Sequence, residues 1–354
     1  MTELELKQLL SKITRPDETA RTAAHAHWAS LAKPLGGLGR LETMLEDAAA
    51  LTGSAELDLS RRVVVVLCAD NGVVAQGVSQ TDQSVTRAVA ENLARRTTSV
   101  CRMAETAHCD VVPVDIGMAG EKVRGVLDRR IADGTADFTQ GPAMTRAQTI
   151  GAIEGGMRLV RDWKAKGYTL LATGEMGIGN TTTSSAVAAA LLGQPVERMT
   201  GRGAGLSDAG LARKIDAIRR GIAVNRPKAD DPLDVLAKLG GLDIAGLCGM
   251  FLGGAIHGIP IVMDGFISGV AALCAARLCP NAGKAAFASH ASSEPAARLV
   301  LEALGKQPLI TADMHLGEGT GAVASIPLWD TALAVYQNCY SFAEGGIEPY
   351  TPQC

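Results

Sequence analysis

The amino-acid sequence predicts an α/β protein in which helices cover a buried parallel sheet. Its 354 residues are 47% hydrophobic, which is enough to form a large core. From Arg62 onward, short runs of apolar and β-branched residues alternate with longer helical patterns. Continuous apolar strands of this kind are typical of a parallel sheet that is buried on both faces. Residues 1–55 contain no strand pattern and therefore predict a separate helical layer.

Helical patterns occupy both ends of the chain. Near the N-terminus, Leu6 and Leu10 belong to one apolar stripe at helical spacing. An Ala-rich helix follows Pro16–Asp17, and the glycine-rich turn KPLGGLGRLE (33–42) leads into another helix. The segment after Trp329 is again helical in pattern. It can join the N-terminal helices.

The strands predicted for the sheet are five apolar segments, residues 62–72, 110–118, 168–175, 259–265 and 284–290. Helical patterns separate them, for example residues 141–163, 181–192 and 266–278. In an open parallel sheet, ligands bind at the carboxyl ends of the strands. Polar residues directly after the predicted strands are therefore candidates for a site, and these are Asp70–Asn71, Glu175, Asp264 and residues 290–294.

One uncharged stretch, residues 244–263, is long enough to span a membrane. However, His257, Gly258 and Pro260 interrupt it, and its second half has a strand-like composition. We predict a buried helix, a turn and a buried strand, and no membrane span.

Composition excludes several classes of function. Lys plus Arg number 34 and Asp plus Glu number 37, so the net charge is −3, whereas a nucleic-acid-binding protein needs a basic surface. Aromatic residues make up only 3%, too few for a base-stacking platform. The eight cysteines form no CxxC motif, and the N-terminus has no signal-peptide pattern. We expect reduced thiols and a cytoplasmic protein.

Two glycine-rich loops precede predicted helices. TGEMGIGNTTT (173–183) can present backbone N–H groups to an anion, with Asn180 and Thr181 as side-chain donors. TGRGAGLSD (200–208) precedes a helix that carries Lys214. Ordinary strand-to-helix turns would also explain both loops. Because neither loop is a Walker motif or GxGxxG, the pair suggests a mononucleotide phosphate held by backbone amides and a lysine.

HLGEGTGA (315–322) places Glu318 between two glycines, which free the backbone to direct the carboxylate into a cleft. A carboxylate beside apolar walls has a raised pKa and can act as a general base. A solvated loop residue remains the alternative. The six histidines are scattered, so the sequence predicts no metal site and no cofactor.

Eight motifs occur together in one order: KPLGGLGRLE, CADNGV, GPAM, TGEMGIGNTT, ARKID, VMDGF, SHASSE and LGEGTGA. In this they resemble the nicotinate-nucleotide–dimethylbenzimidazole phosphoribosyltransferases, over about residues 33–324. The resemblance implies a three-layer, Rossmann-like parallel sheet and a small helical domain built from both chain termini. The expected boundaries are 1–60 (helical), 61–325 (α/β, catalytic) and 326–354 (helical tail). It also implies a homodimer.

The activity implied by the resemblance is transfer of phosphoribose from nicotinate mononucleotide to a lower-ligand base such as 5,6-dimethylbenzimidazole. The products would be nicotinate and an α-ribazole 5′-phosphate, with inversion at the anomeric carbon. By motif position, Glu318 is the base and Glu175 lies near the ribose. The 5′-phosphate would be held by Gly177, Gly203, Lys214 and Ser292. The lower-ligand base would be contacted by Thr81, Met314 and Leu316. Asp243 and Asp264 match acidic positions of unassigned role, and Asp264 can instead cap the helix after its strand.

Departures from the family pattern concern the lower-ligand base. Gly37 stands where the family usually has Ser, Asn71 where it usually has His, and residues 79–84 differ from the usual run. Adenine or a phenol therefore remains an alternative acceptor. A non-catalytic subunit that needs a partner, and a different nucleotide-processing α/β enzyme, are the competing hypotheses.

Overall fold

The computed structural model describes residues 1–350 and contains a six-stranded sheet in the order β3-β2-β1-β4-β5-β6. Every neighbouring pair of strands is parallel, as predicted. The strands are β1 (Arg62–Ala69), β2 (Asp110–Gly117), β3 (Leu127–Asp128), β4 (Leu170–Met176), β5 (Ile261–Met263) and β6 (Ala286–Ala288). The prediction missed β3 because a strand of two residues carries no detectable pattern.

The last predicted strand, residues 284–290, is divided between two sheets. After β6, the backbone N–H of Ser289 still bonds to the carbonyl of Met263, but the Ser289 carbonyl accepts the N–H groups of Leu309 and Ile310. The chain then forms β7 (His290–Ala291), which pairs with β8 (Ile310–Thr311) in a small second sheet. The division depends on hydrogen bonds to segments far away in the sequence. The residue pattern of 284–290 alone therefore does not predict it.

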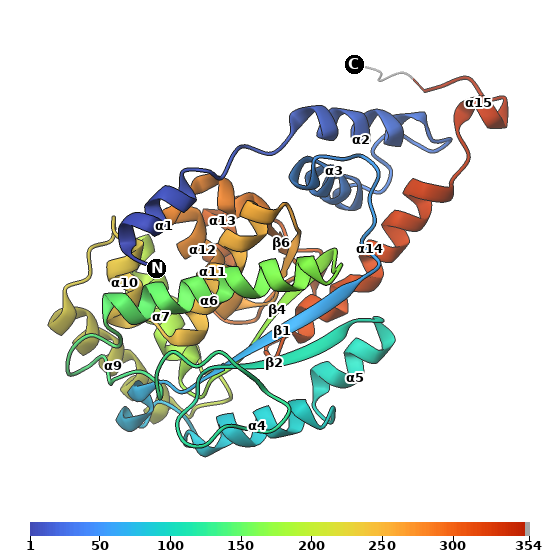
Figure 1. Ribbon diagram of the computed structural model, residues 1–354. Helices are drawn as coiled ribbons and strands as arrows, with labels where there is room; N and C mark the ends of the chain where they lie inside the picture. Colours follow the sequence, from blue (N-terminus) through green and yellow to red (C-terminus); the bar gives the residue numbers. More distant parts are fainter. Residues whose placement is uncertain (351–354) are drawn as a thin grey trace.

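Helices cover both faces of the sheet and give three layers (Figure 1). Alternate side chains of β1 point to opposite faces: Val63 and Val65 pack into the core formed with α6 and α11, whereas Val64 and Val66 pack toward α4, α5 and α14. The helices on the first face include α6 (Arg146–Ala165), α7 (Asn180–Leu192), α9 (Asp208–Asn225), α10 (Pro232–Leu239), α11 (Leu242–His257) and α12 (Phe266–Leu278). Those on the second face include α4 (Ser84–Ala94) and α5 (Ser99–Thr106). Short elements complete the fold: η1 (Gly72–Gln76), α8 (Val196–Met199), η2 (Pro280–Ala285) and α13 (Ala297–Ala303).

The uncharged stretch at residues 244–263 has the predicted form. It contains most of α11, a turn at Gly258 with φ of 58°, and β5. Glycines let α11 approach α6: a Cβ added at Gly249 would overlap the carbonyl oxygen of Ile153. Within residues 1–350, no helix has both the length and the apolar character needed to cross a membrane.

A small helical unit combines both ends of the chain (Figure 1). It contains α2 (Glu18–Ser30), α3 (Arg40–Thr52), the distal part of α14 (Thr320–Asn338) and α15 (Phe342–Gly345). The rings of Trp28 and Tyr336 pack edge-to-face with their centres 4.9 Å apart. The backbones of Leu31 and Ser341 form an isolated antiparallel β-bridge. Because α14 is continuous, the boundary expected at residues 325/326 falls inside a helix. Residues 351–354 of the predicted tail lie outside the described residues.

The first helix, α1 (Glu3–Leu10), lies apart from α2 and α3 (Figure 1). Its apolar stripe, which includes Leu6 and Leu10, is buried in the core of the sheet domain. Glu3 pairs with Arg146 of α6 at 2.6 Å. The helical segment expected at residues 1–60 is therefore divided, because α1 finds its apolar partner on the larger domain.

Candidate functional site

A cleft of about 220 Å³ lies at the carboxyl ends of β4 and β5. This is the edge of the sheet at which the sequence predicted a site. Nine of the predicted site residues line the cleft: Glu175, Gly177, Asn180, Thr181, Gly203, Asp264, Ser292, Leu316 and Glu318. Lys214 and Asp243 lie directly behind them, each in hydrogen-bond contact with a lining residue. The tertiary structure thus brings predicted lining residues from five separate segments to one place, and Lys214 and Asp243 add two more segments behind them.

Glu175, at the end of β4, belongs to a buried network of two carboxyl groups and one amide. The side-chain amide of Asn180 donates to Glu175 Oε2, and also to Asp243 Oδ2 at 3.2 Å. Burial raises the pKa of Glu175 to about 8, and the nearby carboxylates of Asp243 and Asp264 add to this rise. Burial also raises the pKa of Asp243, to about 6. Burial and the neighbouring carboxylates therefore favour the protonated form of Glu175.

Asp264 follows β5 and binds the N-terminus of α14. Its Oδ2 accepts the Gly319 N–H and its Oδ1 accepts the Ala322 N–H, both at 3.1 Å. The alternative considered from the sequence, a cap on the helix after its own strand, is thus replaced by a cap on a helix far along the chain. His290 Nδ1 lies 4.0 Å from Asp264 Oδ1. Burial raises the pKa of Asp264, and burial lowers the pKa of His290.

Glu318 stands at a positive φ of 60°, between Gly317 and Gly319, which also have positive φ. Gly317 has φ of 86°, which favours glycine, and a Cβ there would also lie 2.7 Å from Glu175 Oε1. The Glu318 carboxylate accepts the Val100 N–H at 3.4 Å, in the first turn of α5. Burial raises the pKa of Glu318, while the Val100 N–H opposes the rise. The glycines and the helix terminus together hold this carboxylate at the cleft.

Hydrogen-bond donors gather at the glycine-rich loops. Lys214 is fully buried, and its Nζ donates to Thr181 Oγ1 at 2.8 Å and to the Gly201 carbonyl at 3.1 Å. Burial lowers the pKa of Lys214 to about 8. The Gly203 N–H donates to Glu294 Oε1 at 3.1 Å, and Glu294 Oε2 is buried without a hydrogen-bond partner among the described residues. Backbone N–H groups and a lysine therefore meet at one end of the cleft, and these are the donors that anion-binding sites use.

Two other predicted residues, Thr81 and Met314, are also absent from the lining of the cleft. Thr81 is exposed, in a loop whose neighbour Gln80 donates to the Ala204 carbonyl at 3.0 Å. Met314 is partly buried, and its carbonyl accepts the Ser293 N–H at 3.1 Å. Their expected contacts with a lower-ligand base stay predictions.

Several lining residues received no individual role from the sequence, namely Phe266, His290, Glu294 and His315. Glu294 lies in the SHASSE motif, and His290 follows a strand, so position relative to the strands could have indicated both. Asn71 approaches the site through an Nδ2 bond to the Ile178 carbonyl at 3.5 Å. Within residues 1–350, no group of three or more His, Cys, Asp or Glu side chains is arranged to hold a metal ion.

Comparison with known proteins agrees with this architecture. The phosphoribosyltransferase family model DBI_PRT matches residues 13–347. The nicotinate-nucleotide–dimethylbenzimidazole phosphoribosyltransferase of Acetivibrio thermocellus is 46% identical over 92% of this chain and 93% of its own length. The enzyme of the same name from Ruminiclostridium cellulolyticum is 44% identical over 91% of this chain and 92% of its own length.

A crystal structure of CobT from Thermus thermophilus superimposes with a TM-score of 0.88 and 41% identity, covering 93% of this chain and 99% of that one. The fold and the family match together define the chain as a phosphoribosyltransferase. Among phosphoribosyltransferases, it belongs to the nicotinate-nucleotide–dimethylbenzimidazole family. The resemblance inferred from the eight motifs is confirmed.

Proposed function

We propose that this chain transfers phosphoribose from nicotinate mononucleotide to a lower-ligand base such as 5,6-dimethylbenzimidazole. The products are nicotinate and an α-ribazole 5′-phosphate, with inversion from β to α at C1′. One observation carries the proposal: a single cleft combines amide and lysine donors at the glycine-rich loops with carboxyl groups whose pKa values are raised. An anionic phosphate needs the first set, and proton removal needs the second.

The 5′-phosphate binds at the end of the cleft near Gly203 and Lys214. The Gly203 N–H and Lys214 are the donors there, and the phosphate replaces Glu294 Oε1 and the Gly201 carbonyl as their acceptors. Lys214 donates to Thr181, which lines the cleft. A short movement of the Lys214 side chain therefore brings its ammonium to the phosphate. Burial makes this ammonium a stronger partner for an anion than an exposed lysine would be.

Glu318 acts as the general base. The imidazole nitrogen that attacks C1′ gains positive charge as the bond forms, and loss of the proton from the other ring nitrogen neutralises it. Burial raises the pKa of Glu318, which makes the carboxylate a better proton acceptor near neutral pH. Nicotinate departs from a pyridinium that becomes neutral, so the leaving group needs no added proton.

Glu175 and Asp264 face the ribose from the ends of β4 and β5. Positive charge that develops at C1′ in the transition state is stabilised by nearby carboxylates. Burial raises the pKa of Glu175, and the cationic pyridinium of a bound nucleotide favours the ionised form of this carboxyl group. Asn180 keeps this carboxyl group in place.

The acceptor base is tested with a panel of 5,6-dimethylbenzimidazole, benzimidazole, adenine, phenol and p-cresol, with chromatographic detection of nicotinate. Release that depends on one base supports the proposal and identifies the acceptor. Adenine and phenols are included because Asn71 and the exposed loop at Thr81 differ from the usual family pattern near the lower-ligand base. No release with any base by folded protein favours a subunit that needs a partner. Sedimentation of the purified chain tests the proposed homodimer.

A further inference from the structure

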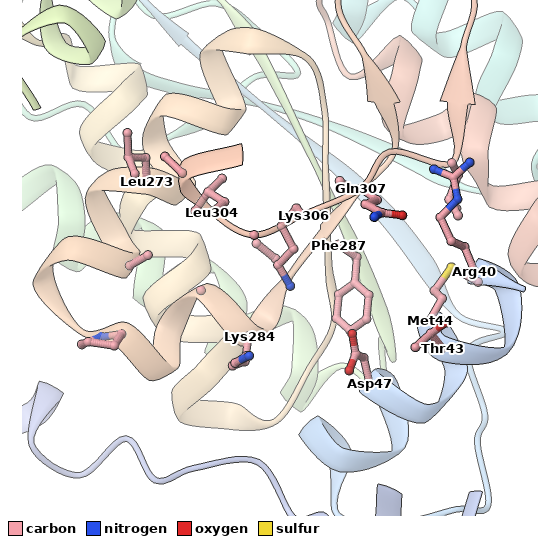
Figure 2. Close-up of a pocket in the computed structure, with 18 of the residues that line it drawn as sticks. Arg40, Thr43, Met44, Asp47, Leu273, Lys284, Phe287, Leu304, Lys306 and Gln307 are labelled. Atoms are coloured by element: carbon pink, nitrogen blue, oxygen red, sulfur yellow. The ribbon is translucent and has the colours of Figure 1, made fainter. Parts of the chain in front are cut away.

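A second, larger cavity of about 660 Å³ lies between the helical unit and the sheet domain (Figure 2). It is lined by α3 on one side and by α12, η2, β6 and the segment after α13 on the other. It shares no lining residue with the cleft that holds Glu175 and Glu318. The proposed transfer reaction makes no use of it.

The lining of this cavity is strongly cationic. Four basic residues line it, namely Arg40, Arg277, Lys284 and Lys306. Its one acidic lining residue, Asp47, is already paired with Arg21. Across residues 1–350, neither Arg277 nor Lys284 nor Lys306 forms an ion pair with a carboxylate. This local excess of positive charge contrasts with the net charge of −3 for the whole chain.

Lys306 is the only one of these cations that is partly buried, whereas Arg40, Arg277 and Lys284 are exposed. It follows Gly305, which turns the chain at the end of α13 with φ of 63°. Its Nζ lies 5.6 Å from the centre of the Phe287 ring, and burial lowers the pKa of Lys306 to about 8. The Asp47 carboxylate partly offsets this effect, but among residues 1–350 no carboxylate forms an ion pair with Lys306. A bound anion would therefore favour the charged ammonium.

The walls between the cations are apolar. Met44 from α3, Leu273 from α12, and Leu304, Leu309 and Phe287 supply apolar lining. Figure 2 shows Met44 to the right of the Phe287 ring, Lys284 and Lys306 to its left, and Asp47 just below it. The volume is in the range of small-molecule sites, which combine apolar walls with a few charged groups. A ligand with both a ring and an anionic group matches this lining.

We propose that this cavity binds a phosphorylated, ring-bearing small molecule of the mononucleotide class, with its phosphate between Lys284 and Lys306 and its ring against Phe287. Because one wall is α3 and the other belongs to the sheet domain, such a ligand bridges the two parts of the chain. The proposal is independent of the reaction proposed for the first cleft.

Calorimetric titration with AMP tests the proposal, with adenosine and inorganic phosphate as probes of the ring and the anion alone. The full-length Lys214→Met variant is the background, because it weakens phosphate binding in the first cleft. In this background, the change Lys284→Gln with Lys306→Gln is expected to weaken AMP binding at least about tenfold, since two charged contacts are lost. The matched control is Lys12→Gln, an exposed lysine elsewhere.

A second readout is proton uptake. Because the pKa of Lys306 is lowered to about 8, a bound phosphate raises it, and AMP binding at pH 8 is accompanied by proton uptake that Lys306→Gln removes. AMP binding that is unchanged by both glutamine substitutions overturns the proposal, as does no detectable AMP binding in the Lys214→Met background. A change in oligomeric state on the same substitutions, without AMP binding, assigns the surface to a second copy of the chain instead.

Discussion

Replacement of Glu318 by Gln is the sharpest test of the proposed mechanism. Glutamine has nearly the same shape, and its side-chain oxygen can still accept the Val100 N–H that Glu318 accepts at 3.4 Å. The glycines on either side, and hence the loop conformation, are unchanged. The substitution therefore removes the basic carboxylate at residue 318 and leaves the position of the side chain nearly unchanged.

General-base catalysis contributes roughly 10²–10⁴-fold to rate. We expect Glu318→Gln to lower kcat by at least ~100-fold, which corresponds to about 2.7 kcal/mol of transition-state stabilisation. The KM for nicotinate mononucleotide should change little, because Glu318 makes no hydrogen bond with Thr181, Gly203 or Lys214. Chromatographic detection of nicotinate, with base and nucleotide varied separately, measures both quantities.

The pH profile provides the second half of this test. A base acts in its ionised form, so wild-type activity falls as the pH drops through the raised pKa of Glu318. This acidic limb should be absent from Glu318→Gln. The exposed residue Glu302, changed to Gln, is the matched control. Turnover by Glu318→Gln within about threefold of wild type, with the acidic limb retained, would refute the assignment.

Three further changes test other parts of the structure. Lys214→Met should raise the KM for nicotinate mononucleotide at least about tenfold, since a buried charged contact to the phosphate is lost; steady-state kinetics would contradict this if only kcat changed. The pKa of Glu175 is raised from an ordinary value of 4.5 to about 8, so protonated Glu175 stabilises the fold at low pH and this contribution is lost as the pH rises to about 8. Urea unfolding at pH 5 and pH 8 should therefore show Glu175→Gln gaining about 3 kcal/mol relative to wild type at the higher pH, and equal pH dependence would exclude the shift. Gly249→Ala should destabilise the fold by about 1–3 kcal/mol, because its Cβ overlaps the Ile153 carbonyl in the contact of α11 with α6. Thermal unfolding measures this against Gly141→Ala, where the new Cβ meets no atom within 4 Å.

Much of the fold followed from local pattern. The apolar runs that became β1, β2, β4 and β5 were predicted because a strand buried on both faces must be apolar along its whole length. The break at Gly258 separated a helix from a strand in the uncharged stretch. In contrast, the sequence did not indicate that α1 packs on the core of the sheet, since an amphipathic stripe shows that a helix packs and leaves its partner undefined.

The candidate site was predictable in outline for a similar reason. Polar residues after parallel strands must meet at one edge of the sheet, so Glu175 and Asp264 were expected together. No local pattern showed that Asp264 would cap α14, that Asn180 would bridge Glu175 and Asp243, or that Glu318 would bind the first turn of α5. Each of these contacts joins segments far apart in the chain.

The sequence by itself determined the alternation of strands and helices, the polar residues at the strand ends and, through eight ordered motifs, the family. Periodicity and glycine placement are local properties, and a motif is written in consecutive residues. Only the tertiary structure decided which buried carboxyl groups share a network, how far their pKa values shift, and that Lys306 faces a cationic cavity between two domains. Desolvation and Coulomb interactions depend on distances through space, and folding sets those distances by bringing remote segments together.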